Sequence, residues 1–308
     1  MDSSPLQAHY ELNSGFKAPI LGLGTSDMKD VDKVIYASIK DGTRLIDTAA
    51  MYGNEEEIGK GINKAIADGI VKREELFVIT KLNICDRENP QQALELSLKR
   101  LNLTYVDLYL DHWPMFIHYD DKGNIIKKAP MHVVWQVMES LVEKGLTKSI
   151  GVSNYNVQSL CNLLSFCKIK PACLEVEFHP YLYQKHLLDF CRKENIRIIA
   201  YNPLVRGPYC KTFHSDANPN LLEEPIITEL ANKYKKTAGQ IVLNWFVCLG
   251  VIPIPRTSSM TRMQENLGAT QFKMEEVDFN KVTALNRNYR FCPSSNWPKW
   301  FDGIEMHA

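Results

Sequence analysis

The sequence of 308 residues has no excess of charge of either sign. Lysine and arginine together number 36, and aspartate and glutamate also number 36, so the formal net charge at pH 7 is zero. Without a general positive potential, the chain has no electrostatic basis for binding nucleic acid, an anionic membrane surface or another polyanion. Any cationic binding site must therefore be local.

Long hydrophobic runs are also missing. No apolar stretch approaches the ~20 residues that a membrane-spanning helix needs. The first residues, MDSSPLQAHYELNSG, do not contain the basic segment followed by an apolar segment that is typical of a secretory leader. We therefore expect no membrane association, and we take a cytosolic location as the default.

The eight cysteines form no CxxC pair and do not have the spacing of metal ligands. Most of them lie in apolar runs such as LLSFC and NWFVC, where a thiol behaves as a small hydrophobic side chain. We expect reduced, structural thiols and no metal site. Because the sequence also lacks a Gly-Ser linker and a low-complexity tract, we interpret residues 1–308 as one domain.

Short apolar runs alternate with longer amphipathic segments over the whole chain. The expected strands are residues 20–24, 44–47, 76–80, 106–110, 149–152, 172–176, 196–200 and 251–254. The expected helices are residues 31–40, 55–67, 91–101, 133–143, 157–166, 186–194 and 238–249, with two more after the last strand at 262–267 and 279–285. This alternation predicts an α/β fold with a parallel sheet, and eight repeats predict closure into a single (β/α)8 TIM barrel.

Some segments fall outside this repeat. HYELNSGFKAPI, before the first strand, predicts a β-hairpin that plugs one end of the barrel, with Asn13, Ser14 and Gly15 in its turn. Residues 115–131 and 205–224 are long insertions, and the tail 290–308 has no regular period. Long irregular segments in a compact domain commonly carry function.

Seven of the eight apolar runs end in, or are directly followed by, a polar residue. In a (β/α)8 barrel, the C-terminal ends of the strands form the rim that carries the active site. Chance readily accounts for one such residue but not for seven in succession. The predicted rim residues are Asp47, Lys81, His112, Asn154, Glu175, Tyr201 and Arg256.

Four residues near this rim suit proton transfer, although each alone has an ordinary structural explanation. Asp47 resembles a helix N-cap, but Asn54 lies closer to the next helix and fits that position better. A phenol such as Tyr52, with a pKa of about 10, is a weak acid near neutrality. An ammonium such as Lys81 lowers the pKa of a neighbouring phenol, and a carboxylate such as Asp47 keeps the ammonium charged. With His112 as a hydrogen-bond donor, the set suits protonation of a carbonyl oxygen.

The sequence contains no Rossmann fingerprint, because GLGTSD at residues 22–27 does not fit GxGxxG. A different anion site is predicted in IPIPRTSSMTRMQEN, where Arg256 and Arg262 flank Thr257, Ser258 and Ser259 before a helix. Such a turn suits a phosphate monoester, for example the 2′-phosphate of NADP. The alternative is a solvated basic turn.

The motifs LGLGTS, RLIDTAAMYGNEEEIG, ITKL, DLYLDHWP, IGVSNY, EVEFHPYL, AYNPL and IPRTSS are together specific, and the chain resembles the aldo-keto reductases, in particular the branch of aldose and xylose reductases. The resemblance implies a barrel with extra C-terminal helices and long βα loops that binds NADP(H). It also implies catalysis by Tyr52 as proton donor, Lys81 as the group that lowers its pKa, Asp47 as the partner of Lys81, and His112 as the residue that orients the carbonyl.

The resemblance further implies a set of cofactor contacts. Tyr201 would stack on the nicotinamide, and the basic turn would hold the 2′-phosphate, so NADPH is favoured over NADH. The implied carboxamide, pyrophosphate, phosphate and adenine contacts, with the neighbouring rim residues, are Thr25, Asp47, Ser153, Asn154, Glu175, Tyr201, Asn202, Leu204, Arg206, Arg256, Thr257, Ser258, Ser259, Arg262, Glu265 and Asn266.

The sequence departs from the family pattern at positions that bear on cofactor and substrate. Glu175 stands where the family usually has Gln, and an ionised carboxylate there would stabilise the positively charged oxidised ring. Ser26 stands where aldose reductases often have Trp, which predicts a wider or more polar pocket. The expected substrate contacts are Tyr52, His112, Trp113, Ser26 and Trp297.

The implied activity is NADPH-dependent reduction of an aldehyde or ketone, such as an aldose or a small aldehyde, to the alcohol. One alternative is an aldose-6-phosphate reductase, since the ending GIEMHA is similar to plant hexose-phosphate reductases. Another is a regulatory or structural barrel that binds the cofactor without turnover. His112 argues against a double-bond reductase, because that branch has Glu at this position. A monomer and a dimer are both compatible with the sequence.

Overall fold

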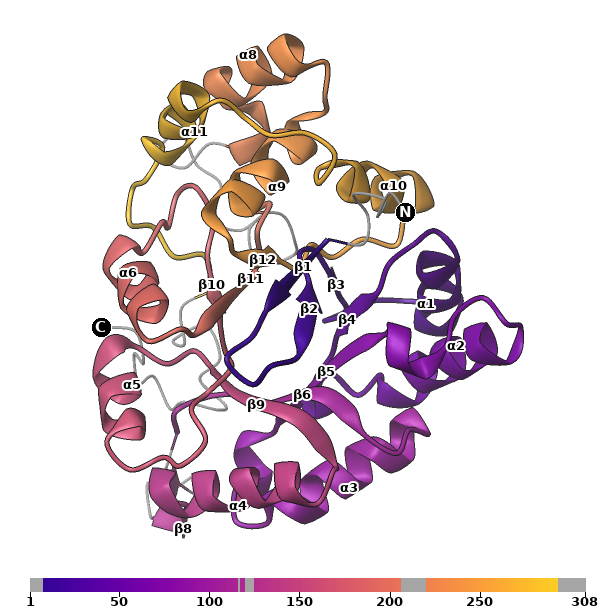
Figure 1. Ribbon diagram of the computed structural model, residues 1–308, viewed down its shortest axis with the longest axis vertical. Coiled ribbons are helices and arrows are strands. Elements are labelled where there is room, and N and C mark those ends of the chain that lie inside the picture. The colour runs from indigo at the N-terminus through magenta and orange to yellow at the C-terminus, as the bar shows by residue number, and fades with distance from the viewer. Residues whose placement is uncertain (1–7, 116, 120–124, 206–219, 293–308) are drawn as a thin grey trace.

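The computed structural model describes residues 8–115, 117–119, 125–205 and 220–292. Eight parallel strands follow one another around a barrel in chain order. They are β3 (Leu23–Gly24), β4 (Leu45–Asp47), β5 (Phe77–Leu82), β6 (Val106–Asp111), β9 (Thr147–Ser153), β10 (Cys173–Glu177), β11 (Arg197–Tyr201) and β12 (Ile252–Pro253). Figure 1 looks along the barrel, with the helices around its outside. The predicted (β/α)8 barrel is confirmed.

The barrel closes between its first and last strands. The Gly22 N–H donates to the carbonyl oxygen of Pro253 at 3.0 Å, and the Gly24 N–H donates to that of Pro255 at 3.3 Å. A Cβ atom at Gly24 would lie 2.8 Å from the carbonyl oxygen of Ile254. Any side chain there would push the two backbones apart, so the glycines of LGLG permit this closure.

The nine expected helices are present, with bounds that differ by a few residues at most. They are α1 (Val31–Lys40), α2 (Glu55–Ala67), α3 (Pro90–Leu101), α4 (Met131–Glu143), α5 (Val157–Leu164), α6 (Lys185–Lys193), α9 (Ala238–Leu249), α10 (Met260–Gly268) and α11 (Glu276–Thr283). Short 3-10 helices are η2 (Ala50–Tyr52), η3 (Arg73–Glu75), η4 (Ile84–Asp86) and η5 (Leu221–Glu223).

Three elements were missing from the sequence prediction. Helix α8 (Pro225–Tyr234) begins at a proline, which suits the first helical position because it has no N–H to satisfy. Strands β7 (Ile117–Tyr119) and β8 (Ile125–Lys128) pair as an antiparallel hairpin inside the insertion at 115–131. The insertion is therefore not wholly irregular.

The predicted plug is also present. Strands β1 (His9–Glu11) and β2 (Lys17–Pro19) form an antiparallel hairpin that crosses the centre of the barrel in Figure 1. Leu12 and Ala18 of the hairpin are buried in one hydrophobic cluster with residues of the barrel interior such as Leu45, Leu108 and Ile252. The hairpin closes one end of the barrel, so a ligand must enter at the opposite rim.

Among the described residues, no helix is long and apolar enough to cross a membrane. No disulfide joins any two of the seven cysteines in the described part of the chain, and Cys210 lies outside it.

Candidate active site

The loop after β4 carries Tyr52 to the rim and is fixed by Asn54. Tyr52 ends the short helix η2, and Gly53 follows with a φ of 68° that reverses the chain. Asn54 stands at the N-cap position of α2, as predicted, but its side chain does not cap the helix. Instead its Oδ1 accepts from the Thr48 hydroxyl and its Nδ2 donates to the Thr25 carbonyl oxygen, both at 2.9 Å. Asn54 thus joins the loop after β4 to the loop after β3.

Lys81, at the end of β5, lies between two carboxyl groups. Its Nζ donates to Asp47 Oδ2 at 2.6 Å and to the Thr48 carbonyl oxygen at 3.0 Å. The same Nζ is 3.3 Å from Oε1 of Glu175. Burial alone would lower the pKa of Lys81, but the neighbouring carboxyl groups, Asp47 foremost, outweigh burial and raise this pKa above its ordinary value. Lys81 is therefore a buried, permanent cation.

Tyr52 faces this cation across a short distance. Lys81 Nζ lies 5.3 Å from the centroid of the Tyr52 ring. Burial raises the pKa of the Tyr52 phenol, and Lys81 acts in the opposite direction without cancelling the rise. The expected effect of Lys81 on the phenol has the right sign, but burial is the larger effect. In this state Tyr52 retains its proton.

His112 directly follows the C-terminal end of β6 and lies beside Tyr52. The two rings meet edge to face with centroids 5.9 Å apart, and Trp113 stacks on His112 at 6.5 Å. Burial and then the positive charge of Lys81 lower the pKa of His112 well below its ordinary value. The imidazole is therefore neutral near pH 7, and its Nδ1 is buried without a hydrogen-bond partner in the described structure. It can act as a neutral hydrogen-bonding group.

The segment that carries His112 and Trp113 is held by three residues that sequence reasoning missed. The Arg87 guanidinium pairs with Asp111, and its Nη1 also donates to the Trp113 carbonyl oxygen at 2.5 Å. The Tyr155 hydroxyl donates to the other Asp111 oxygen at 2.7 Å. Asp111 directly precedes His112 in DLYLDHWP. An acid at the end of the strand, next to a predicted site residue, was the signal that could have identified this contact.

A cavity of about 830 Å³ opens at the C-terminal rim of the barrel and contains most of the predicted site. It is lined by 16 of the predicted residues: Thr25, Ser26, Asp47, Tyr52, His112, Trp113, Asn154, Glu175, Tyr201, Asn202, Leu204, Arg256, Thr257, Arg262, Glu265 and Asn266. Asp27, Met51 and Cys292 also line it and were not predicted. Arg206 and Trp297 lie outside the described residues.

Three predicted cofactor residues do not line the cavity, and two of them have structural roles. The Ser153 hydroxyl is buried and donates to the Glu175 carbonyl oxygen at 2.9 Å. Ser259 Oγ caps α10 by accepting from the Arg262 N–H at 3.4 Å. Ser258 is not among the residues that line the cavity. A contact of these three residues with a cofactor stays a prediction.

Two arginines and two acids, Asp27 and Glu265, line the far end of the cavity. Arg256, Thr257 and Arg262 line it beside the N-terminus of α10, and exposed helix N–H groups there favour an anion. Nη1 of Arg256 also donates to the carbonyl oxygens of Ser26 at 2.9 Å and Asp27 at 2.7 Å. One guanidinium therefore connects the loop after β3 with the loop after β12. This donor set fits a phosphate group.

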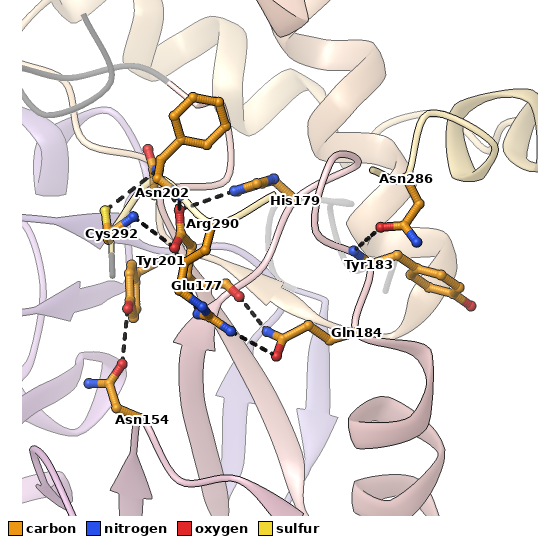
Figure 2. A network of polar contacts seen from close by, with 11 residues as sticks. Asn154, Glu177, His179, Tyr183, Gln184, Tyr201, Asn202, Asn286, Arg290 and Cys292 are labelled. Carbon is orange, nitrogen blue, oxygen red and sulfur yellow. Dashed lines mark hydrogen bonds and ion pairs between the residues drawn. The ribbon is translucent and has the colours of Figure 1, made fainter. Parts of the chain in front are cut away.

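Glu177 organises one wall of the cavity (Figure 2). Its buried carboxylate accepts from the backbone N–H groups of Phe291 and Cys292, each at 3.0 Å, and from Nδ2 of Asn202 at 3.2 Å. His179 Nε2 lies 3.2 Å from the same carboxylate. Glu177 follows Glu175 by two residues in EVEFHP, and a second acid on the same strand was the only sequence signal. Glu177 thus links the backbone of Phe291 and Cys292 to Asn202, which directly follows β11.

Comparisons with known proteins agree with this geometry. A model of the aldo/keto reductase family matches residues 17–287. The chain is 38% identical to an NAD(P)H-dependent D-xylose reductase of Pyricularia oryzae, over 93% of this chain and 95% of the relative. It is also 38% identical to aldose reductase B of Dictyostelium discoideum, over 95% and 97% of the two chains. The crystal structure of a Bombyx mori aldo-keto reductase in complex with NADP is 35% identical, with a TM-score of 0.86 over 95% of this chain and 97% of that one. The chain thus belongs to the aldo/keto reductase family and is an oxidoreductase.

Proposed function

We propose that the protein reduces an aldehyde or ketone to the alcohol with NADPH, and that Tyr52 donates the proton. One observation carries the proposal: a single cavity runs from Tyr52 and His112 to the basic group of Arg256 and Arg262. A ligand with a reactive ring at one end and a phosphate at the other fits such a cavity. The names of the xylose reductase and the NADP complex above support this choice of ligand.

The residues at the rim divide the work between them. When bound, the cofactor supplies a hydride equivalent to the carbonyl carbon. Tyr52 protonates the carbonyl oxygen, and its phenol is suitable because burial keeps the proton on it until negative charge develops on the substrate. Lys81 then stabilises the phenolate that remains. His112 is neutral and can donate a hydrogen bond to the same oxygen without becoming a competing acid.

Tyr201 and Asn154 are suited to the nicotinamide end. Both line the cavity, and Tyr201 offers the face of its ring, while its hydroxyl is held by Asn154 Oδ1 at 2.9 Å. At the other end, two guanidinium groups and the Thr257 hydroxyl provide charge-assisted contacts for a 2′-phosphate. This end favours NADPH over NADH.

The substrate end is partly polar. Trp113 provides an apolar wall, and the small side chain of Ser26 lies on the cavity lining. An aldose or another small aldehyde suits a wall of this kind, and the named activities of the two curated relatives support this class. A single domain, a cytosolic location and a monomeric or dimeric state stay predictions.

The test is a panel of aldehydes and ketones, including xylose and glyceraldehyde, assayed with NADPH and with NADH by nicotinamide absorbance. We expect turnover with preference for NADPH, and a loss of roughly 10²–10⁴-fold in kcat for Tyr52→Phe with NADPH binding retained. Tyr105→Phe, a phenol outside the cavity, is the matched control and should keep full activity. Tight NADPH binding without turnover on any member of a broad panel would contradict the proposal.

A further inference from the structure

Lys81 is shared between two acids, and this sharing constrains the charge of the site. Its Nζ is 2.6 Å from Asp47 and 3.3 Å from Glu175, and the three side chains are at most 3% exposed. If both acids were ionised, the group would carry one uncompensated negative charge away from water. Such a buried charge is costly, so two acids that share a site normally keep one proton between them.

The contacts favour Glu175 over Asp47 as the holder of this proton. Burial, and then the charge of Asp47, raise the pKa of Glu175 well above its ordinary value, and Lys81 acts in the opposite direction. The pKa of Asp47 is also raised by burial, but its closer contact with Lys81 opposes the rise. The shorter ion pair therefore keeps Asp47 ionised, while Glu175 is the neutral partner.

Other titratable groups also act on Glu175. Those that interact with it are Asp47 on β4, Lys81 on β5, Tyr52 in the loop after β4, Tyr201 on β11 and Cys173 on its own strand β10. Lys81 is the one cation among them. Its charge is balanced by Asp47, so among these groups Glu175 is the remaining carboxyl group that can balance a further positive charge at the nicotinamide end.

One oxygen of Glu175 receives no hydrogen bond from an N–H or O–H group of the described residues. Its Oε2 is buried and has no hydrogen-bond partner in the described part of the chain. Its side chain lines the cavity together with Asn154, Tyr201 and Tyr52, the residues suited to the nicotinamide end. A ligand amide in this position would lie beside an oxygen that accepts from no donor among the described residues, while the acid proton of Glu175 is shared with Asp47. Glu175 is therefore placed to sense what binds there.

We propose that Glu175 makes the choice between oxidised and reduced cofactor depend on pH: it is a neutral acid beside the reduced ring and ionises beside the oxidised, cationic ring. This inference rests on the proposed NADP(H) site. With the neutral ring, Lys81 and Asp47 balance each other. When the cationic ring is bound, Glu175 loses its proton to solvent. The positive charges of the ring and Lys81 are then balanced by the negative charges of Asp47 and Glu175. A glutamine cannot supply the second negative charge.

A measurable proton follows from this arrangement. Binding of NADP+ releases about one proton at a pH where Glu175 is neutral in the free protein, whereas binding of NADPH releases none. The ratio of the dissociation constants of NADP+ and NADPH therefore falls with rising pH, by up to roughly tenfold per pH unit. In the variant Glu175→Gln, the ratio is independent of pH over the same range.

Titration calorimetry in buffers of different ionisation enthalpy measures this proton. Tyr52 is a second group that can release a proton to solvent when the cationic ring binds. We therefore choose Tyr52→Phe as the background and add Glu175→Gln to it. We expect proton release on NADP+ binding in the background, and loss of that release in the double variant. Glu139→Gln in the same background is the matched control, since Glu139 is a buried acid on α4 that accepts from backbone N–H groups outside the cavity.

Equal proton release in the background and the double variant would overturn the inference and leave the proposed function intact. Failure of both cofactor forms to bind the wild type would overturn the two together. If Glu175→Gln does not fold, infrared spectroscopy of the wild type replaces it. The band of an un-ionised carboxyl group should weaken when NADP+ is added but not when NADPH is added, and an unchanged band would contradict the inference.

Discussion

The Tyr201 hydroxyl donates a 2.9 Å hydrogen bond to Oδ1 of Asn154. The amide of Asn154 is fixed in turn, because its Nδ2 donates to the His112 carbonyl oxygen at 3.0 Å. The ring proposed to stack on the nicotinamide and the backbone of the proposed carbonyl-binding histidine are therefore connected through a single side chain. Variants of Tyr201 can therefore separate the contribution of the ring to cofactor binding from the contribution of the hydroxyl.

Tyr201→Phe keeps the ring and removes the hydrogen bond. A net hydrogen bond contributes about 0.5–1.5 kcal/mol, so we expect the dissociation constant of NADPH to rise roughly two- to tenfold. Tyr201→Ala should weaken binding further because it also removes the stacking face. Fluorescence titration with NADPH measures both effects. Tyr36→Phe, which loses a hydrogen bond to Asp68 on the outside of the barrel, should leave binding unchanged, and equal losses for Phe and Ala would contradict a stacking role.

Arg262→Ala should weaken NADPH binding selectively. If this guanidinium contacts the 2′-phosphate, its loss removes a charge-assisted interaction of about 1.5–3 kcal/mol, which is roughly ten- to a hundredfold in the dissociation constant. NADH lacks that phosphate, so its dissociation constant should stay the same. Lys99→Ala, on the exposed face of α3, tests for an unspecific effect of charge. A parallel loss for NADPH and NADH would show that Arg262 does not recognise the phosphate.

Lys81→Met should destabilise the fold strongly, because it leaves the buried charge of Asp47 without its partner. Removing one partner of a buried ion pair typically costs about 3–5 kcal/mol, because the other charge is left without compensation. In Asp47→Asn combined with Lys81→Met, the remaining acid Glu175 is neutral, so the double variant should be more stable than Lys81→Met alone. Denaturant unfolding measures the difference. Additive losses would mean that the two side chains do not act as a pair.

Glu175→Gln should become more stable relative to the wild type as pH rises. The raised pKa of Glu175 means that the folded protein keeps a proton that the unfolded chain loses above about pH 4.3. The free energy of unfolding of the wild type therefore falls with rising pH, by at most about 1.4 kcal/mol per pH unit, until the folded pKa is passed. The glutamine lacks this dependence. Parallel curves of unfolding free energy against pH for the two proteins would contradict a raised pKa of Glu175 in the folded protein.

Glu177→Gln should show the opposite dependence. Burial alone would raise the pKa of Glu177, but His179, Arg290 and the Cys292 N–H together lower it below its ordinary value. Its contribution to stability is therefore present above the unfolded pKa of about 4.3 and is lost as pH falls through the folded pKa. We expect the variant to be less stable at pH 7, with a gap that narrows in acid. Glu143→Gln, exposed on α4, is the control, and a gap that does not depend on pH would argue against an ionised Glu177.

The predicted fold succeeded where a periodic pattern repeats. Eight strands and nine helices follow from the alternation of apolar runs with amphipathic segments, because each pattern depends on neighbours in the chain. Helix α8 and the hairpin β7–β8 were missed because they lie in or directly after segments without a clear period. Asn54 shows a second limit: its position at the start of α2 was predicted correctly, but its side chain forms hydrogen bonds with Thr25 and Thr48 instead of capping the helix.

The sequence by itself determined the type of barrel, the rim that carries polar groups, and Asp47, Tyr52, Lys81 and His112 as a chemically consistent set. Only the tertiary structure decided how these groups share charge. It placed Glu175 against Lys81 and Asp47, where burial raises the pKa of the Glu175 carboxyl group, and it gave Glu177 the role of holding the backbone at Phe291 and Cys292. The reason is physical: residue type depends on the sequence, whereas the burial and the neighbouring charges that set a protonation state come from strands far apart in the chain.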